Sequence, residues 1–447
     1  MLDKYFNLRA KRESIWWKSV FVLFLRATAV LALFCVDVVL GRLLGTSGFG
    51  VYSNAVATIM ILTVVSLLGL ENMMIREVAI SGESGTVGYT NHIVRWGFKT
   101  AVRLSVIIAL LFSGYIFVLH PYDNPMMQTT MLIGLLLLPM LVVSNIVGII
   151  LRGFHKILTG QTIQHVVQPL VLVVGVGYFY FSCSGLSPAI AMAISTAGWF
   201  VAMVLAIVLL KQNLKPCSEE NNKRLVTKSL WTTSLVFAVI AGAQMTNSRI
   251  DIMMTYWFVG ESEAGIYSAT VRICDLLVFA IIAINISIGP TLACLHHSGE
   301  INKLQAVATI AARVSTIAAL PVILLVSLFS QFSMGLFGPD FVGSPWPLII
   351  LCVSQAVVVL TGSKTLLLVM SGEERNTAFV LGVTAILHIC VSIALIPLLG
   401  ILGAAISTAL SVICWSLWLT CVSIRTLKID PTVFNVFSTP NTTNPKN

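Results

Sequence analysis

The stretch SVFVLFLRATAVLALFCVDVVL, residues 19–40, decides the class of fold. It is an almost unbroken run of apolar side chains, and it is long enough for one α-helix to cross the roughly 30 Å apolar core of a bilayer. Backbone amide and carbonyl groups find no water in that core, so such a segment must satisfy them within its own helix. No small-residue cleavage site follows the run, so we expect a retained transmembrane helix rather than a signal peptide.

The same pattern recurs along the chain, which is 57% hydrophobic and only 10% charged. An ordinary soluble domain contains roughly 25% charged residues. The sequence therefore predicts an all-α polytopic membrane protein of about twelve transmembrane helices. The predicted spans are residues 19–40, 50–70, 100–119, 130–151, 163–182, 187–210, 230–258, 266–294, 307–330, 347–370, 378–397 and 402–424.

Lysine and arginine are divided very unevenly between alternate loops. If both termini lie in the cytoplasm, the loops on the outer side contain a single basic residue, Arg42. Basic loops are retained on the cytoplasmic side, so we expect a multi-pass membrane protein with both termini cytoplasmic. The net charge of +9 reflects this orientation and does not indicate a nucleic-acid partner.

Two short stretches occur twice in the chain. GVYSNAV at residues 50–56 recurs as GIYSATV at 265–271, 215 positions later, and AISTA at 193–197 recurs at 405–409. Six spans per copy is an even number, so both copies begin on the same side of the membrane. We therefore expect two parallel six-helix lobes related by a pseudo-two-fold axis along the membrane normal.

The longest polar linker, KQNLKPCSEENNKRLVTK at residues 211–228, falls near the middle of the chain. It is the expected hinge between the lobes. The predicted divisions are an N-terminal lobe at 1–210, a cytoplasmic linker at 211–228, a C-terminal lobe at 229–428 and a polar cytoplasmic tail at 429–447.

Motifs for catalysis, metal binding or cofactor binding are absent from the sequence. The nine cysteines stand singly, and the loops contain no clustered carboxylates, glycine-rich phosphate loop or GxSxG. We predict neither disulfides nor a metal ion nor a cofactor, and we do not expect an enzyme. The functional residues should instead be charges inside the membrane, which are costly there unless they pair or line a wet cavity.

The first predicted span contains Arg26 and Asp37. Eleven steps of 100° bring both onto nearly one helix face. Arg26 lies deep enough to line a cavity, although its side chain could also extend back to the inner interface. For Asp37, a contact at the helix end and a role in ion coupling are both open.

Other charges lie in the second half of the chain. The stretch QMTNSRID, residues 244–251, contains Gln244, Asn247, Arg249 and Asp251 and is typical of cavity lining. Arg272 and Asp275 are three residues apart, a spacing that also suits an ion pair on one helix surface.

Lys364 lies in TGSKT, residues 361–365, which is a polar break in a predicted span. It could contact an anion, or its side chain could extend to the inner interface.

Four stretches carry a resemblance to a known family. VVLGRLLGTSGFGVYSNAVATI at 38–59, LGLENMMIREVA at 68–79, the RxD at 249–251 and GIYSATVRI at 265–273 resemble the Wzx-type polysaccharide flippases. These belong to the multidrug/oligosaccharidyl-lipid/polysaccharide (MOP) exporter superfamily, and the resemblance covers nearly the whole chain.

The resemblance implies a flippase of a bacterial inner membrane. It would move undecaprenyl-diphosphate-linked oligosaccharide from the cytoplasmic to the periplasmic leaflet by alternating access of two lobes. A polysaccharide polymerase and a chain-length regulator would be partners in the same pathway. The implied contacts to diphosphate and sugar are Arg26, Arg249, Arg272, Lys364, Gln244 and Asn247, and the candidate ion-coupling residues are Asp37, Asp251 and Asp275.

Two alternatives within the superfamily remain open: a cation-coupled multidrug exporter and a lipid II flippase. Acids should dominate the cavity of an exporter of cationic drugs, whereas arginines are at least as prominent in these spans. A membrane-embedded glycosyltransferase or polymerase would need a large outer loop or a carboxylate constellation, and the sequence shows neither.

Overall fold

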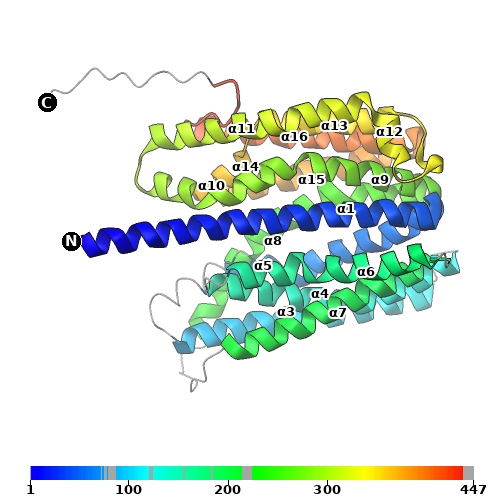
Figure 1. Cartoon of the computed structure of the whole chain (residues 1–447), viewed down its shortest axis with the longest axis horizontal. Coiled ribbons are helices and arrows are strands. Elements are labelled where there is room, and N and C mark those ends of the chain that lie inside the picture. The colour runs from blue at the N-terminus through cyan, green and yellow to red at the C-terminus, as the bar shows by residue number, and fades with distance from the viewer. Residues whose placement is uncertain are drawn as a thin grey trace. The chain divides into compact units, whose positions relative to one another are not determined.

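The computed structural model describes the backbone of residues 2–71, 73–74, 78, 87–119, 124–154, 157–182, 185–213 and 224–435. Within these ranges, the side chains of 2–26, 87–91, 119, 157–158, 213, 224–233, 280, 283, 286–287 and 290 are not described. The described chain is nearly all helical and contains no strand, so the predicted all-α class is confirmed (Figure 1).

Figure 1 labels most of the helices in chain order. Their bounds are α1 (Leu2–Leu67), α3 (Val87–Leu119), α4 (Pro125–Gly153), α5 (Ile157–His165), α6 (Val167–Phe181), α7 (Pro188–Asn213), α8 (Arg224–Phe258), α9 (Glu261–Leu277), α10 (Phe279–His297), α11 (Ile301–Leu328), α12 (Ser330–Gly335), the 3₁₀ turn η1 (Pro339–Phe341), α13 (Trp346–Leu360), α14 (Lys364–Met370), α15 (Glu374–Leu399) and α16 (Ile401–Thr426).

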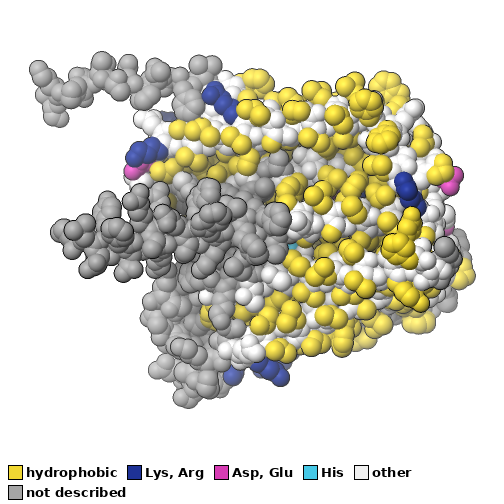
Figure 2. Space-filling model, viewed as in Figure 1, with side chains coloured by type: hydrophobic (Ala, Val, Ile, Leu, Met, Phe, Trp, Pro, Cys, Tyr) yellow, Lys and Arg dark blue, Asp and Glu magenta, His cyan; other side chains and the backbone are white. Residues whose placement is uncertain are grey.

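Within the described residues, eight helical segments are long and apolar enough to cross a membrane, and a bent pair makes a ninth. Figure 2 shows hydrophobic side chains spread over the described helix surfaces, with lysine and arginine toward the helix ends. Such a surface would be unfavourable in water and suits lipid. Each of the twelve predicted spans falls on one helix or on two consecutive helices, so a multi-pass membrane protein is confirmed.

The first two predicted spans lie within the single element α1, which is broken at Gly45. Gly45 has φ 67° and ψ −178°, a conformation that only glycine adopts at low cost. The break replaces the expected loop, because one glycine is enough to redirect the chain between the two spans.

The chain divides into two compact units. Unit 1 is Met1–Ala269 with Gly335–Phe341, and unit 2 is Thr270–Met334 with Val342–Asn447. In unit 1, α4 lies at the centre and packs against α1, α3 and α7. In unit 2, α16 packs against α13 and α15, and α10 packs against α11. The predicted lobe boundaries stay a prediction, and residues 214–223 of the predicted linker lie outside the described residues.

The short segment Gly335–Phe341 belongs to unit 1 because its aromatic side chains pack on α1. The Phe337 ring lies 5.8 Å from that of Phe34 and 5.9 Å from that of Phe49, measured between centroids. Gly41 leaves room for this contact, since a Cβ there would lie 2.9 Å from the Phe337 ring. Arg42, the one basic residue predicted outside, donates from Nε to the Leu336 carbonyl at 2.7 Å.

Candidate functional site

The polar stretch predicted to line a cavity lies on α8 in unit 1. Gln244 is exposed, Asn247 and Arg249 are half-buried, and Asp251 is only 3% exposed. Tyr267 of α9 donates its hydroxyl to Asp251 Oδ2 at 3.3 Å. A carboxyl group inside an apolar bilayer is costly without such a partner. The hydrogen bond from Tyr267 is therefore part of what stabilises Asp251 within α8.

The remaining predicted charges are spread over both units. Asp37 is half-buried on α1, and Arg272 and Asp275 are half-buried on α9. Arg26 lies in α1, but its side chain is outside the described residues. The roles of these residues stay predictions.

Lys364 lies at a break in a membrane span of unit 2. The helices α13 and α14 meet at 41°, and Gly362 between them has φ 64°. Lys364 is 1% exposed, and its Nζ donates to Thr361 Oγ1 at 2.6 Å and to the Val358 carbonyl at 3.2 Å. The same Nζ lies 4.7 Å from the Trp415 ring centroid. The lysine therefore points into the protein rather than toward an interface.

A second arrangement in unit 1 brings together the two copies of the repeated GxYS sequence, and we call it the glycine seam. It consists of Thr46, Ser47 and Gly50 on α1 and Glu261, Ser262 and Gly265 on α9. A Cβ at Gly50 would lie 1.9 Å from the Glu261 carbonyl oxygen, and one at Gly265 would lie 2.0 Å from that of Thr46. The two contacts are equivalent, because Gly50 corresponds to Gly265 in the repeat and Thr46 corresponds to Glu261. This is a local two-fold relation of the kind that symmetric interfaces have.

Hydrogen bonds between hydroxyl and carboxylate groups join the two helices of the glycine seam at one end. Ser47 donates to Glu261 Oε2 at 2.7 Å, and Ser262 donates to Thr46 Oγ1 at 2.8 Å. Glu261 Oε1 also accepts from Asn124 Nδ2 at 2.5 Å and from the Tyr256 hydroxyl at 3.3 Å. Asn124 in turn caps α4, since its Oδ1 accepts from the Met126 amide at 2.9 Å. One carboxylate thus joins α1, α4 and α8 to the start of α9.

Sequence reasoning singled out the glycine-containing repeat but missed Glu261. The signal was present, because Glu261 follows Gly260 at the start of a helix, where the helix dipole favours an acid. Glu261 occupies the position in the second copy that Thr46 occupies in the first. A comparison of the two copies alone would therefore not have singled out a carboxylate at this position.

The candidate site residues offer fixed charge and close backbone contact. Arginine and lysine side chains within spans offer fixed positive charge to an anion. The glycine seam offers close backbone contact held by side-chain hydrogen bonds that solvent can replace.

The described chain has the fold of MOP-superfamily transporters. It is similar to a multidrug resistance MATE family transporter of that superfamily in an inward-facing conformation, with a TM-score of 0.73, 13% identity and coverage of 91% of this chain and 98% of that one. It is also similar to the MATE multidrug transporter DinF-BH, with a TM-score of 0.64, 14% identity and coverage of 94% and 96%.

The chain belongs to the polysaccharide biosynthesis protein family, whose family model matches residues 16–296. The predicted resemblance is thereby confirmed. The chain is 31% identical over 172 residues to "Probable flippase AglR" of Haloferax volcanii, covering 38% of this chain and 36% of that protein. It is 25% identical over 266 residues to "Probable low-salt glycan biosynthesis flippase Agl15" of the same organism, covering 59% and 54%. The matches thus span between a third and about half of the curated relatives' length.

Proposed function

We propose that this protein is a flippase for undecaprenyl-diphosphate-linked oligosaccharide. It would move the repeat unit from the cytoplasmic to the periplasmic leaflet of a bacterial inner membrane for O-antigen, capsule or exopolysaccharide synthesis. The observation that carries the proposal is membership of the polysaccharide biosynthesis protein family over residues 16–296. Both curated relatives are named as flippases and are archaeal, so the carrier lipid and the bacterial membrane are part of the proposal.

The charges inside the spans support an anionic substrate. Arg249 on α8, Arg272 on α9 and Lys364 at the α13–α14 break are candidate contacts to the diphosphate, with Arg26 added from the sequence. Guanidinium groups suit a diphosphate because they donate in a planar fork. Gln244 and Asn247 on α8 are the candidate contacts to sugar hydroxyl groups.

In the proposed cycle, the diphosphate enters from the cytoplasmic side while the glycine seam closes the outer side. The lipid tail remains in the bilayer. The two predicted lobes, residues 1–210 and 229–428, then rock, so that the seam between α1 and α9 parts and the sugar is released. Asp37, Asp251 and Asp275 are the candidate sites for a coupling proton or sodium ion. A polysaccharide polymerase and a chain-length regulator would act on the released product.

The test is the leaflet distribution of lipid-linked sugar in cells that lack the protein. A membrane-impermeant probe should show diphosphate-linked oligosaccharide accumulating in the cytoplasmic leaflet. Wild-type protein should clear it, Arg249→Ala should fail at equal membrane abundance, and Arg103→Ala should behave as wild type because Arg103 is exposed on α3. An unchanged pool in the deletion strain would refute the proposal.

A multidrug exporter is the second candidate, because the similar solved structures are of MATE multidrug transporters. In that case the deletion would raise sensitivity to cationic drugs and leave the sugar pool unchanged. A lipid II flippase, the third alternative, would be distinguished by accumulation of the peptidoglycan precursor and loss of viability.

A further inference from the structure

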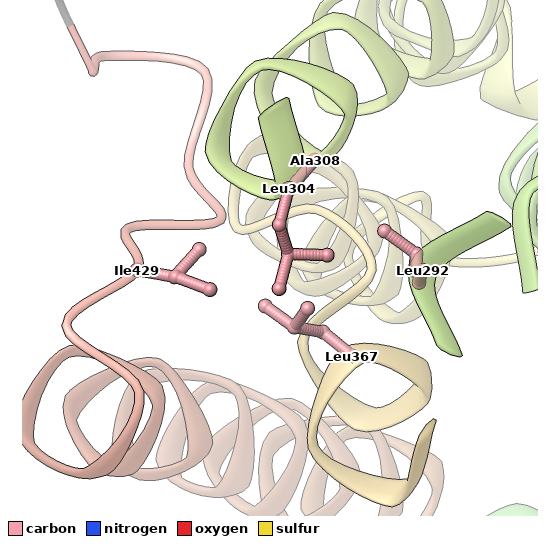
Figure 3. Packing of buried hydrophobic residues seen from close by; sticks show 5 residues of the cluster. All are labelled: Leu292, Leu304, Ala308, Leu367 and Ile429. Carbon is pink, nitrogen blue, oxygen red and sulfur yellow. The ribbon is translucent and has the colours of Figure 1, made fainter. Parts of the chain in front are cut away.

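The residues just after α16 form a structured segment of unit 2, although residues 429–447 were predicted as a polar tail. We call residues 427–435 the C-terminal strap. Ile429 is fully buried in a cluster with Leu292 of α10, Leu304 and Ala308 of α11 and Leu367 of α14. Figure 3 shows the Ile429 side chain directed at these residues. Burial of this apolar side chain anchors the strap.

Polar contacts fix the course of the strap over α11. Gln305 pairs with the backbone of Asp430 in both directions: its Nε2 donates to the carbonyl at 2.6 Å, and its Oε1 accepts from the amide at 2.8 Å. Further along, Arg313 Nη2 donates to the Asn435 carbonyl at 2.9 Å. Ser423 at the end of α16 donates to the Ile429 carbonyl at 2.8 Å. The strap is thus tied at both ends.

The middle of the strap lies against the break between α13 and α14. The Val433 amide donates to the Leu360 carbonyl at 3.1 Å. A Cβ at Gly362 would lie 2.3 Å from the Pro431 carbonyl oxygen, so the strap and the break are in direct backbone contact. Only glycine allows this approach together with a φ of 64°.

The carbonyl groups at the end of α13 show what the strap contributes. A helix leaves its last four carbonyls without intrahelical partners. Here the Val357 carbonyl accepts from the Thr361 amide, that of Val358 from Lys364 Nζ, that of Val359 from the Gly362 amide, and that of Leu360 from the strap. The strap and Lys364 therefore both donate to carbonyl groups at the same helix end.

We propose that the C-terminal strap is a positioning element that sets the α13–α14 bend and thereby the place of the Lys364 ammonium group in the transport path. The inference rests on the proposed function, in which Lys364 contacts the anionic group of the substrate. The contacts of Lys364 in the described structure are a carbonyl, a hydroxyl and an aromatic ring, all neutral, and its side chain is only 1% exposed, so a diphosphate would have to displace one of these contacts to reach it. Loss of the strap's hydrogen bond would misplace the ammonium group while leaving the span in the membrane.

The experiment uses full-length protein in proteoliposomes with a fluorescent polyprenyl-diphosphate disaccharide as the probe, and it measures flipping rate against probe concentration. Val433→Pro removes the amide donor, and Val433→Ala is the matched control that keeps it. Gln305→Leu, matched in size, releases the strap at a second point and guards against misfolding of the proline variant. Each variant is made both in the wild-type protein and in protein that carries Lys364→Met.

Val433→Pro and Gln305→Leu should each raise the apparent KM about tenfold, a change equivalent to ~1.4 kcal/mol of binding, and Val433→Ala should not. In the Lys364→Met background neither should raise it further, since sites that act through one group are not additive. Equal effects on KM in both backgrounds, or no effect on KM in either, would overturn the positioning role of the strap. The proposed flippase function would be unaffected by that result. Failure of the wild type to flip the probe would overturn the proposed function and this inference with it.

Discussion

The two copies in the glycine seam differ in residue type at Glu261, because Thr46 occupies the corresponding position in the other copy. The Glu261 carboxylate accepts hydrogen bonds from Ser47, Asn124 and Tyr256. Glu261→Ala should lower the free energy of unfolding by about 1–3 kcal/mol, because three donors lose a charged acceptor. Thermal unfolding in detergent measures this. Glu263→Ala, in the same first turn of α9, is the control, and an equal loss in both variants would contradict the prediction.

Glu71 provides a prediction about pH. It follows α1, outside the membrane-spanning segment Ala27–Leu67. Burial raises the pKa of its carboxyl group from the ordinary 4.5, although the nearby Arg152 guanidinium opposes that shift. Since the folded state disfavours the carboxylate, stability should fall as pH rises from 4.5 through the raised pKa and then stay level. Glu71→Gln should therefore unfold at a higher temperature than wild type at pH 8, with the difference shrinking at acid pH. A less stable variant at pH 8 would rule this out.

At the scale of elements, the two seam glycines should be sensitive to a single methyl group. A Cβ at Gly50 or Gly265 would meet backbone oxygen at 1.9 Å or 2.0 Å, so α1 and α9 would have to move apart. Gly50→Ala and Gly265→Ala should each destabilise the protein by about 1–3 kcal/mol.

The matched control is Gly242→Ala on α8, where a Cβ would meet nothing within 4 Å. It should be neutral or stabilising by about 0.5–1 kcal/mol, because alanine favours a helix. The midpoint temperature of thermal unfolding, measured for the three variants and the wild type, tests both expectations. The interpretation of the seam as a close backbone contact would be wrong if Gly50→Ala behaved as Gly242→Ala does.

The helices could be predicted from the sequence, as could the polar break at residues 361–365, but the break at Gly45 could not. Apolar length alone locates a span, because the bilayer sets that length. The break at Gly45 depends on a φ value that a glycine in an apolar run permits without requiring. The burial of Ile429 was likewise missed, because its partners lie on three helices distant in sequence. Charged residues within spans identified candidate contacts, yet the partners of Asp251 and Lys364 came only from the structure.

At the scale of the whole molecule, the repeat predicted one relation that the structure shows locally. GVYSNAV and GIYSATV were expected to correspond, and the glycines of both stretches lie against each other in unit 1. The lobe boundaries at the polar linker stay a prediction, because residues 214–223 lie outside the described residues. The orientation in the membrane likewise rests on lysine and arginine alone.

That orientation leads to a prediction about the two faces of the protein. Basic loops are held in the cytoplasm during insertion, so a green fluorescent protein fused after residue 447 should fold and fluoresce inside the cell. A short epitope inserted after Gly343, between η1 and α13, should be detected by antibody in intact spheroplasts. An epitope inserted after Gly299, beside the exposed Lys303 at the start of α11, should be detected only after permeabilisation. If the Gly299 epitope were accessible and the Gly343 epitope protected, the cytoplasmic face would be reversed. The strap would then lie outside the cell, where it could not position Lys364 for a substrate that enters from the cytoplasm.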